Sequence, residues 1–227
     1  MTYGAVLIFA RRPELGKVKT RLESRLGKQL TLAVYRAFLA DTLEAARQGN
    51  ATVILAHTPG PRFPEQDLAD LVIEQRGITF GERFDSAFED SANLLRKQTP
   101  IVLIGADTPH LSPDSLRDAI DTLGGCGAVI GQNFTNGFYL LGFASYPVPV
   151  SEVFSYPSIE ETVALQRLLH TAGIVTRYLT LQFDIDTLKD LVRLVHLIGA
   201  SKGQVGKWIP KNTRDVLVDS GIIQLAA

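Results

Sequence analysis

The sequence predicts a single α/β domain with a doubly wound, mainly parallel sheet and helices on both faces. Short apolar runs alternate with amphipathic helical segments over most of the chain. The run at residues 101–104 is apolar throughout, as in a central parallel strand. No internal repeat or linker divides the chain. We therefore expect one domain over residues 1–200 and a tail with a short helix over residues 201–227.

The strands are predicted from apolar runs that end at Gly, Pro or polar residues. In chain order they cover residues 5–9, 51–57, 71–74, 101–104, 128–131, 138–143 and 174–183. The first run leads directly into a basic loop. The fourth and seventh runs are each followed by acidic residues.

The helices are predicted from apolar residues three and four positions apart. In chain order they cover residues 29–48, 81–95, 113–123, 158–173, 188–198 and 212–220. Gly49 is placed to end the first helix. Ser112 precedes Pro113 as an N-cap, and Ser158 with Glu161 forms a capping box.

The composition excludes several classes of protein. A chain of 227 residues that is 45% hydrophobic can bury a sizeable core. Its net charge of −1 argues against a nucleic-acid or membrane-surface role. The single Cys126 can form neither an internal disulfide nor a cysteine-based zinc site, and no signal peptide or spanning segment is evident. We therefore expect a cytoplasmic protein that binds small molecules.

Five cations lie close together in the loop that follows the first strand. They are Arg11, Arg12, Lys17, Lys19 and Arg21. Gly16 lets the backbone approach an anion, and the charged groups neutralise it, so this segment predicts phosphate binding. Neither the Walker loop nor the dinucleotide glycine pattern is present. The alternative is a solvated basic loop.

Carboxylates follow two of the predicted strands, where ligands of open α/β sheets bind. Asp107 comes after the run at 101–104, and Asp184 and Asp186 come after the run at 174–183. Strand alternation places the last two on one side of the backbone. We expect the three to hold Mg²⁺, or Mn²⁺, with phosphate oxygens. Each could instead serve as a helix cap or turn residue, as Asp186 before Thr187 would.

Three segments together resemble a known family. They are residues 9–13 with 16–22, residues 104–111, and residues 137–142. The chain is similar to the glycosyltransferase-A-like family of unknown function in the nucleotide-diphospho-sugar transferase superfamily, which is related to phospholactate and molybdenum-cofactor guanylyltransferases. The segments at 81–84 and 184–187 also resemble family positions.

The resemblance implies an enzyme that binds a nucleotide or nucleotide-sugar and a small-molecule acceptor. The basic loop, with Gly81 and Arg83, would contact the nucleotide. Lys19 and Arg21 would stabilise the leaving phosphate, and Asp107 would hold a divalent metal. Glycosyl transfer from a nucleotide-sugar is the first expectation. Nucleotidyl transfer with release of diphosphate is the alternative.

The chain departs from the family where an acceptor would bind. The family carries Asp-Gly-Gly before its aromatic strand, whereas this chain has Thr135, Asn136 and Gly137. Asn136 can form hydrogen bonds but does not replace a charge. A degenerate, non-catalytic module that binds a nucleotide or a partner is therefore a third hypothesis. The base, the acceptor and the oligomeric state, including a homo-oligomer, stay open.

Overall fold

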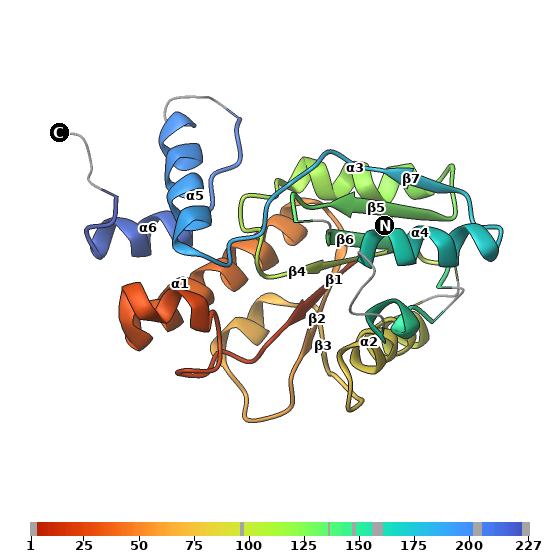
Figure 1. Ribbon diagram of the computed structural model, residues 1–227, viewed down its shortest axis with the longest axis horizontal. Coiled ribbons are helices and arrows are strands. Elements are labelled where there is room, and N and C mark those ends of the chain that lie inside the picture. Colours follow the sequence, from red (N-terminus) through yellow and green to blue (C-terminus); the bar gives the residue numbers. More distant parts are fainter. Residues whose placement is uncertain are drawn as a thin grey trace.

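The computed structural model describes residues 4–95, 98–135, 137–146, 149–155, 161–201 and 206–223. Within these residues the centre is a seven-stranded sheet in the order β3-β2-β1-β4-β6-β5-β7 (Figure 1). The strands are β1 (Ala5–Ala10), β2 (Thr52–His57), β3 (Leu71–Glu74), β4 (Ile101–Gly105), β5 (Ala128–Gln132), β6 (Phe138–Phe143) and β7 (Thr176–Tyr178). Strand β6 runs antiparallel to β4 and β5, and the other pairs are parallel. The predicted mainly parallel sheet is confirmed.

Helices cover both faces of this sheet. They are α1 (Thr20–Gln48), α2 (Phe80–Leu94), α3 (Pro113–Leu123), α4 (Glu161–Thr171), α5 (Leu188–Ala200) and α6 (Lys211–Asp219), with 3₁₀ helices η1 (Pro64–Leu68) and η2 (Ser151–Ser155). One apolar cluster joins α1 and α3 to one face, and a second joins α2, α4 and η2 to the other. The doubly wound arrangement is therefore also confirmed.

Register brings the ends of β1 and β4 to the same edge of the sheet. Phe9 of β1 pairs with Gly105 of β4, and Ala10 pairs with His57 of β2. Because these strands are parallel, the chain leaves both of them on one side. The basic loop after Ala10 therefore starts beside the segment that carries Asp107.

Helix α1 begins earlier than the expected residue 29. It starts at Thr20 and contains a kink at Gly27, whose φ of 74° and ψ of 161° are not helical. The part before the kink is rich in charge, so it lacks the apolar stripe that predicts a helix. Lys19 precedes it in the left-handed region, with φ 46° and ψ 43°.

The prediction for residues 174–183 is wrong in length, because β7 has only three residues. After β7 the backbone finds other partners. The carbonyl of Thr180 accepts a hydrogen bond from the Tyr139 hydroxyl at 2.9 Å, and Gln182 forms only an isolated bridge to Asn133. The capping box expected at Ser158 lies outside the described residues, and α4 is described from Glu161.

Helices α5 and α6 lie at one end of the molecule beside α1 (Figure 1). A third apolar cluster joins these helices. Asp41 of α1 accepts hydrogen bonds from the backbone of Asn212 at 3.0 Å and of Thr213 at 2.7 Å. These bonds satisfy free N–H groups at the start of α6.

The domain boundary at residue 200 stays a prediction. No helix in the described ranges combines the length and the apolar character that crossing a membrane requires.

Candidate active site

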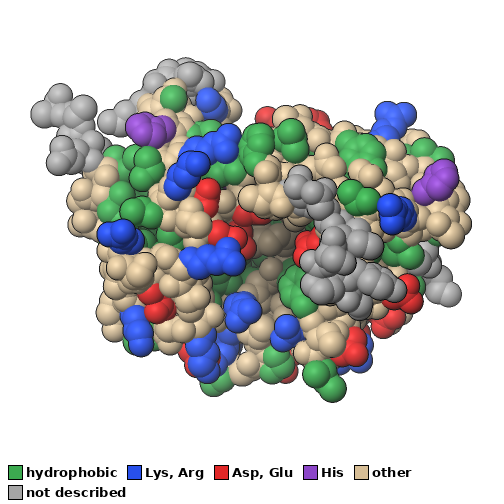
Figure 2. All heavy atoms as spheres, in the orientation of Figure 1, with side chains coloured by type: hydrophobic (Ala, Val, Ile, Leu, Met, Phe, Trp, Pro, Cys, Tyr) green, Lys and Arg blue, Asp and Glu red, His purple; other side chains and the backbone are tan. Residues whose placement is uncertain are grey.

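A cleft of about 430 Å³ opens at the shared edge of β1 and β4. It appears as the hollow near the centre of Figure 2, with basic side chains along one side of it and acidic side chains at its rim. The charged residues that line it are Arg11, Lys17, Lys19, Arg21, Arg83, Asp107 and Asp186. Cations outnumber carboxylates here, so the cleft suits an anionic ligand.

Lys19 lies between two carboxylates at the base of the cleft. Its Nζ is 2.7 Å from Asp107 Oδ1 and 2.8 Å from Asp186 Oδ1, and its side chain is only 6% exposed. Burial alone would lower the pKa of Lys19, but the charges of Asp107 and Asp186 outweigh that effect and raise it. Lys19 is therefore a fixed positive charge that holds two acids from distant parts of the chain together.

The two acidic segments are also joined through their backbones. The Ile185 N–H donates to the carbonyl of Asp107 at 2.9 Å. This bond places Asp186 beside Asp107 even though β7, which precedes it, is at the far edge of the sheet. The relative position of Asp107 and Asp186 is thus fixed by this backbone hydrogen bond as well as by Lys19.

Arg21 and Asp107 line the same cleft, as the sequence predicts. Arg21 Nη1 is 3.7 Å from Asp186 Oδ2, and its side chain is 75% exposed. Because this contact is long and solvated, it holds the guanidinium only weakly. Arg21 is free to reorient toward a ligand at the mouth of the cleft.

Two further arginines contribute positive charge from different elements. Arg11 belongs to the loop after β1, and its carbonyl accepts a hydrogen bond of 2.7 Å from the Tyr35 hydroxyl. Arg83 belongs to the first turn of α2, and its Nε is buried with no hydrogen-bond partner among the described residues. A buried donor without a partner is costly, so a ligand oxygen could satisfy it.

Four other residues predicted for phosphate binding have structural roles, and three of them lie outside the cleft lining. Arg12 pairs with Glu14 and lies close to Gly60. Gly16 turns the loop with a φ of 75°. Gly81 packs against η2, because a Cβ there would lie 2.7 Å from Ser151 Cα. Lys17 lines the cleft but is also paired with Glu14. The roles of these four in ligand binding stay predictions.

Asp184 lines a second, smaller cavity of about 190 Å³ beside the cleft. Its Oδ2 accepts a hydrogen bond from Asn133 Nδ2 at 2.5 Å, and burial raises its pKa to about 6. Gly137 donates its N–H to Asn133 Oδ1 at 2.8 Å, so it supports this acid indirectly. Asn136, the other residue predicted at the acceptor, lies outside the described residues.

Aromatic residues form half of the lining of the second cavity, and no sequence pattern predicts this role. Those that line it are Phe9, Phe80, Phe84, Phe138, Tyr139 and Phe154. Tyr139 is buried and also lines the cavity, whereas Phe138 is only half-buried. An aromatic residue on a buried stripe has no feature in sequence that separates a pocket wall from a core position.

A divalent metal fits this site only as a partly formed centre. No group of three or more His, Cys, Asp or Glu in the described ranges is arranged to hold a metal, so the predicted set of Asp107, Asp184 and Asp186 is not assembled. Asp107 and Asp186 nevertheless both contact Lys19 Nζ and present hard oxygen donors. Mg²⁺ often binds through one or two carboxylates, with phosphate oxygens and water as its other ligands. The donors present therefore fit a metal that arrives with a phosphate ligand.

Comparison of this fold with solved structures finds several similar proteins. A protein from Desulfovibrio desulfuricans G20, provisionally named a nucleotide-diphospho-sugar transferase, is 24% identical with a TM-score of 0.82, and the match covers 98% of this chain and 96% of that one. A cytidylyltransferase from Leptospira borgpetersenii is 16% identical with a TM-score of 0.52 and coverage of 100% and 99%. The 4-diphosphocytidyl-2C-methyl-D-erythritol synthase from Anaerococcus prevotii is 13% identical with a TM-score of 0.55 and coverage of 85% and 94%.

The fold is therefore that of the nucleotide-diphospho-sugar transferases. No curated protein matches the chain in sequence. The model of a family described as uncharacterized proteins conserved in bacteria matches residues 39–156, which is more than half of the chain. The chain belongs to this family, DUF2064.

Proposed function

We propose that this protein is a divalent-metal-dependent transferase that binds a nucleotide-sugar in the cleft and moves its glycosyl group to a small acceptor. The observation that carries the proposal is the buried Lys19 ammonium between Asp107 and Asp186, in a cleft with four further cations. The names of the structural neighbours, which include a nucleotide-diphospho-sugar transferase and cytidylyltransferases, support a nucleotide ligand.

The charge of the cleft suits a diphosphate. Five cations and two carboxylates line it, which leaves an excess of positive charge. Guanidinium groups bind phosphate oxygens in pairs, and Arg11, Arg21 and Arg83 line the cleft from the loop after β1, from α1 and from α2. Such groups stabilise charge that develops on a leaving phosphate, which is the main demand of this chemistry.

Asp107 and Asp186 would hold the metal. A bound Mg²⁺ or Mn²⁺ would draw charge from the phosphate oxygens of the leaving group. In this structure the Lys19 ammonium lies between the two acids and offsets part of their negative charge, so their mutual repulsion is reduced before the ligand arrives. Lys19 Nζ can donate to a phosphate oxygen from the same position, and Arg21 can close over the ligand from the rim.

Nucleotidyl transfer is the second candidate, because it requires the same cations and the same metal. The cytidylyltransferases among the structural neighbours favour it. One assay separates the two reactions. The protein is incubated with Mg²⁺, an acceptor library and either nucleoside triphosphates or nucleotide-sugars. Release of diphosphate supports nucleotidyl transfer, and release of nucleoside diphosphate supports glycosyl transfer.

A non-catalytic nucleotide-binding module is the third candidate, and it predicts binding without turnover. Its test is calorimetry with the same nucleotides, with and without metal. Binding that ignores the metal would favour this module. Turnover that disappears in Asp107→Asn would exclude it.

A further inference from the structure

The second cavity opens beside the cleft and shares part of its wall. Phe9, Phe80 and Asp107 line both spaces. A ligand in the second cavity would therefore lie next to whatever occupies the cleft, on the other side of Asp107. We call this second cavity, defined by its lining residues, the aromatic pocket.

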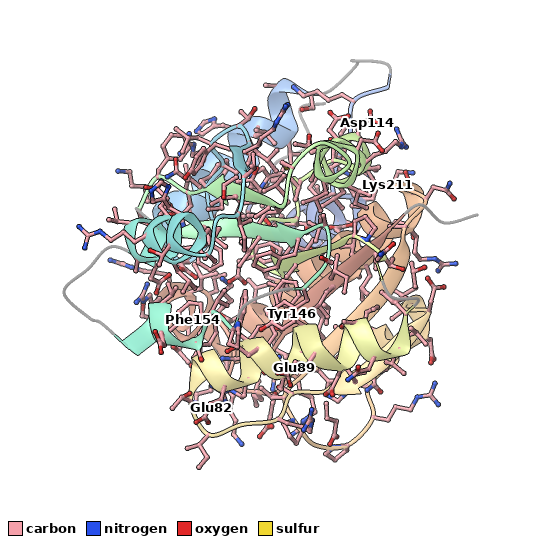
Figure 3. The ribbon with its side chains drawn as sticks, turned by 90° about the vertical axis from the view of Figure 1, so that its right-hand side faces the viewer. Glu82, Glu89, Asp114, Tyr146, Phe154 and Lys211 are labelled. Carbon is pink, nitrogen blue, oxygen red and sulfur yellow. The ribbon has the colours of Figure 1, made fainter. Side chains whose placement is uncertain are left out.

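The wall of the aromatic pocket is a set of rings from four elements: Phe9 of β1, Phe80 and Phe84 of α2, Phe138 of β6 and Phe154 of η2. The Phe80 and Phe154 rings meet edge to face with centroids 4.8 Å apart, and Phe84 and Phe138 do so at 6.1 Å. Figure 3 shows Phe154 near one end of α2, on the side toward the sheet. The mutual contacts fix the rings, so the pocket is preformed.

The polar groups of the aromatic pocket all favour a positive or neutral ligand. Asp184, Glu161 and the shared Asp107 line it, and none of its described lining residues is Lys, Arg or His. Thr108 also lines it, and this residue is only 2% exposed. The Thr108 hydroxyl has no hydrogen-bond partner in the described part of the chain. A buried hydroxyl without a partner can accept a hydrogen bond from a ligand donor.

We propose that the aromatic pocket binds the acceptor, and that the acceptor is a compact apolar amine, with its ring or branched chain against the phenylalanines and its ammonium near Asp184, Glu161 and Thr108. In the transfer, one ammonium proton passes to the Glu161 carboxylate and the nitrogen forms a bond to the anomeric carbon of the sugar. The bond from that carbon to the diphosphate oxygen breaks, and the nucleoside diphosphate leaves. The role as acceptor rests on the transferase function proposed above, whereas the binding of the amine does not. Aromatic faces and carboxylates both attract an ammonium, and the same carboxylates repel a phosphorylated or carboxylic acid. The cleft and the aromatic pocket would thus select opposite charges side by side.

The first test is direct binding without any nucleotide. Three molecules of similar shape are titrated by ligand-observed NMR at neutral pH: 2-phenylethylamine, 2-phenylethanol and 3-phenylpropionate. We expect the amine to bind about tenfold more tightly than the alcohol. This is the gain in affinity expected when a cation contacts aromatic faces and carboxylates. The carboxylate should bind weakest. Equal binding of all three, or tightest binding of the carboxylate, would overturn the proposal.

The second test places the amine in this pocket. Thr108→Val removes the unpaired hydroxyl while keeping the shape of the side chain. Thr31→Val is the matched control, because Thr31 is equally buried in α1 with an unpaired hydroxyl and does not line the pocket. We expect Thr108→Val to weaken amine binding about fivefold without lowering the midpoint of thermal unfolding. If Thr108→Val binds the amine as tightly as the unchanged protein, the amine does not bind in the aromatic pocket.

A third variant tests the charge preference. Glu161→Gln should reduce the preference for amine over alcohol severalfold, whereas Glu152→Gln, an exposed acid of η2 outside the lining, should not. Nucleotide binding, measured separately by calorimetry, keeps the two proposals apart. If nucleotides bind and the amine does not, the acceptor inference fails alone. If the amine binds and nucleotides do not, the transferase proposal fails and the amine site stands.

Discussion

The cleft and the aromatic pocket meet at Asp107 but differ in charge and in origin. Cations dominate the cleft, and most of them come from one short segment between β1 and α1. Phenylalanines from four elements dominate the pocket, where the described lining residues include carboxylates and no cation. In the proposed function, the cleft holds phosphate and the aromatic pocket selects the molecule that receives the transferred group. The predictions below test this division of roles.

The largest expected effect belongs to Asp107, the carboxylate that both regions share. Asp107→Asn keeps the shape of the side chain but removes a charge that would hold the metal. We expect turnover to fall about 10²–10³-fold, the range for losing one group that stabilises transition-state charge. Asp114→Asn, at an exposed position of α3 that lines neither space, is the control and should keep full activity. Equal activity of the two variants would mean that Asp107 lies outside the reaction.

Lys19→Ala should affect the cleft alone. A charge-assisted hydrogen bond contributes about 1.5–3 kcal/mol, so we expect nucleotide binding to weaken more than tenfold. Stability should change little, because Asp107 and Asp186 are 42% and 47% exposed and water can solvate them once the ammonium is gone. Calorimetry and thermal unfolding measure the two effects. Lys189→Ala, at an exposed position of α5, is the control. If Lys19→Ala binds the nucleotide with the same dissociation constant as Lys189→Ala, Lys19 does not contact the nucleotide.

A histidine two residues after Thr108 provides a test of stability against pH. His110 stacks on Phe183 with centroids 4.3 Å apart, and burial lowers its pKa to about 4. The unfolded chain takes up this proton first, near its ordinary pKa of about 6.5, so stability is lost as pH falls from there toward 4. The loss is at most about 1.4 kcal/mol per pH unit. Denaturant unfolding from pH 7 to 4 should show this slope, and His110→Phe should reduce it. If the free energy of unfolding of His110→Phe depends on pH as steeply as that of the unchanged protein, His110 is not the group responsible.

Arg83→Gln should give the smallest effect. The buried Nε of Arg83 has no hydrogen-bond partner among the described residues, so binding a phosphate oxygen is its expected use. We expect nucleotide affinity to fall about threefold to tenfold, as for loss of one hydrogen bond to a charged group in a partly solvated site. Arg76→Gln is the matched control, because Arg76 is already paired with Asp90 at 2.6 Å. If both variants bind the nucleotide equally, Arg83 does not contact it.

Most of the cleft could be predicted from the sequence, because the residues that form it lie in short, recognisable segments. Arg11, Lys19 and Arg21 lie close together in the chain, and Asp107 directly follows an apolar strand. Parallel strands that start in register must end at one edge, so these segments had to meet. The separation of Asp184 from Asp186 into two cavities was not readable. It depends on the Asn133 hydrogen bond and on the Lys19 contact, which are tertiary.

The aromatic pocket was not readable from sequence for a physical reason. Phe84 and Phe138 fall on apolar stripes whose pattern is the same in a core and in a pocket wall. Phe154 belongs to a 3₁₀ helix of five residues, for which no periodicity can be detected. Thr108 is polar and nearly fully buried, which no local pattern predicts.

The most direct test of the account is nucleotide binding with and without metal. Calorimetry would titrate a panel of nucleoside triphosphates and nucleotide-sugars into the protein, first with a chelator and then with Mg²⁺ or Mn²⁺. The account predicts that one nucleotide binds at least about tenfold more tightly with metal, and that Asp107→Asn removes this gain while keeping the metal-free affinity. The same affinity with and without metal for every nucleotide would contradict it.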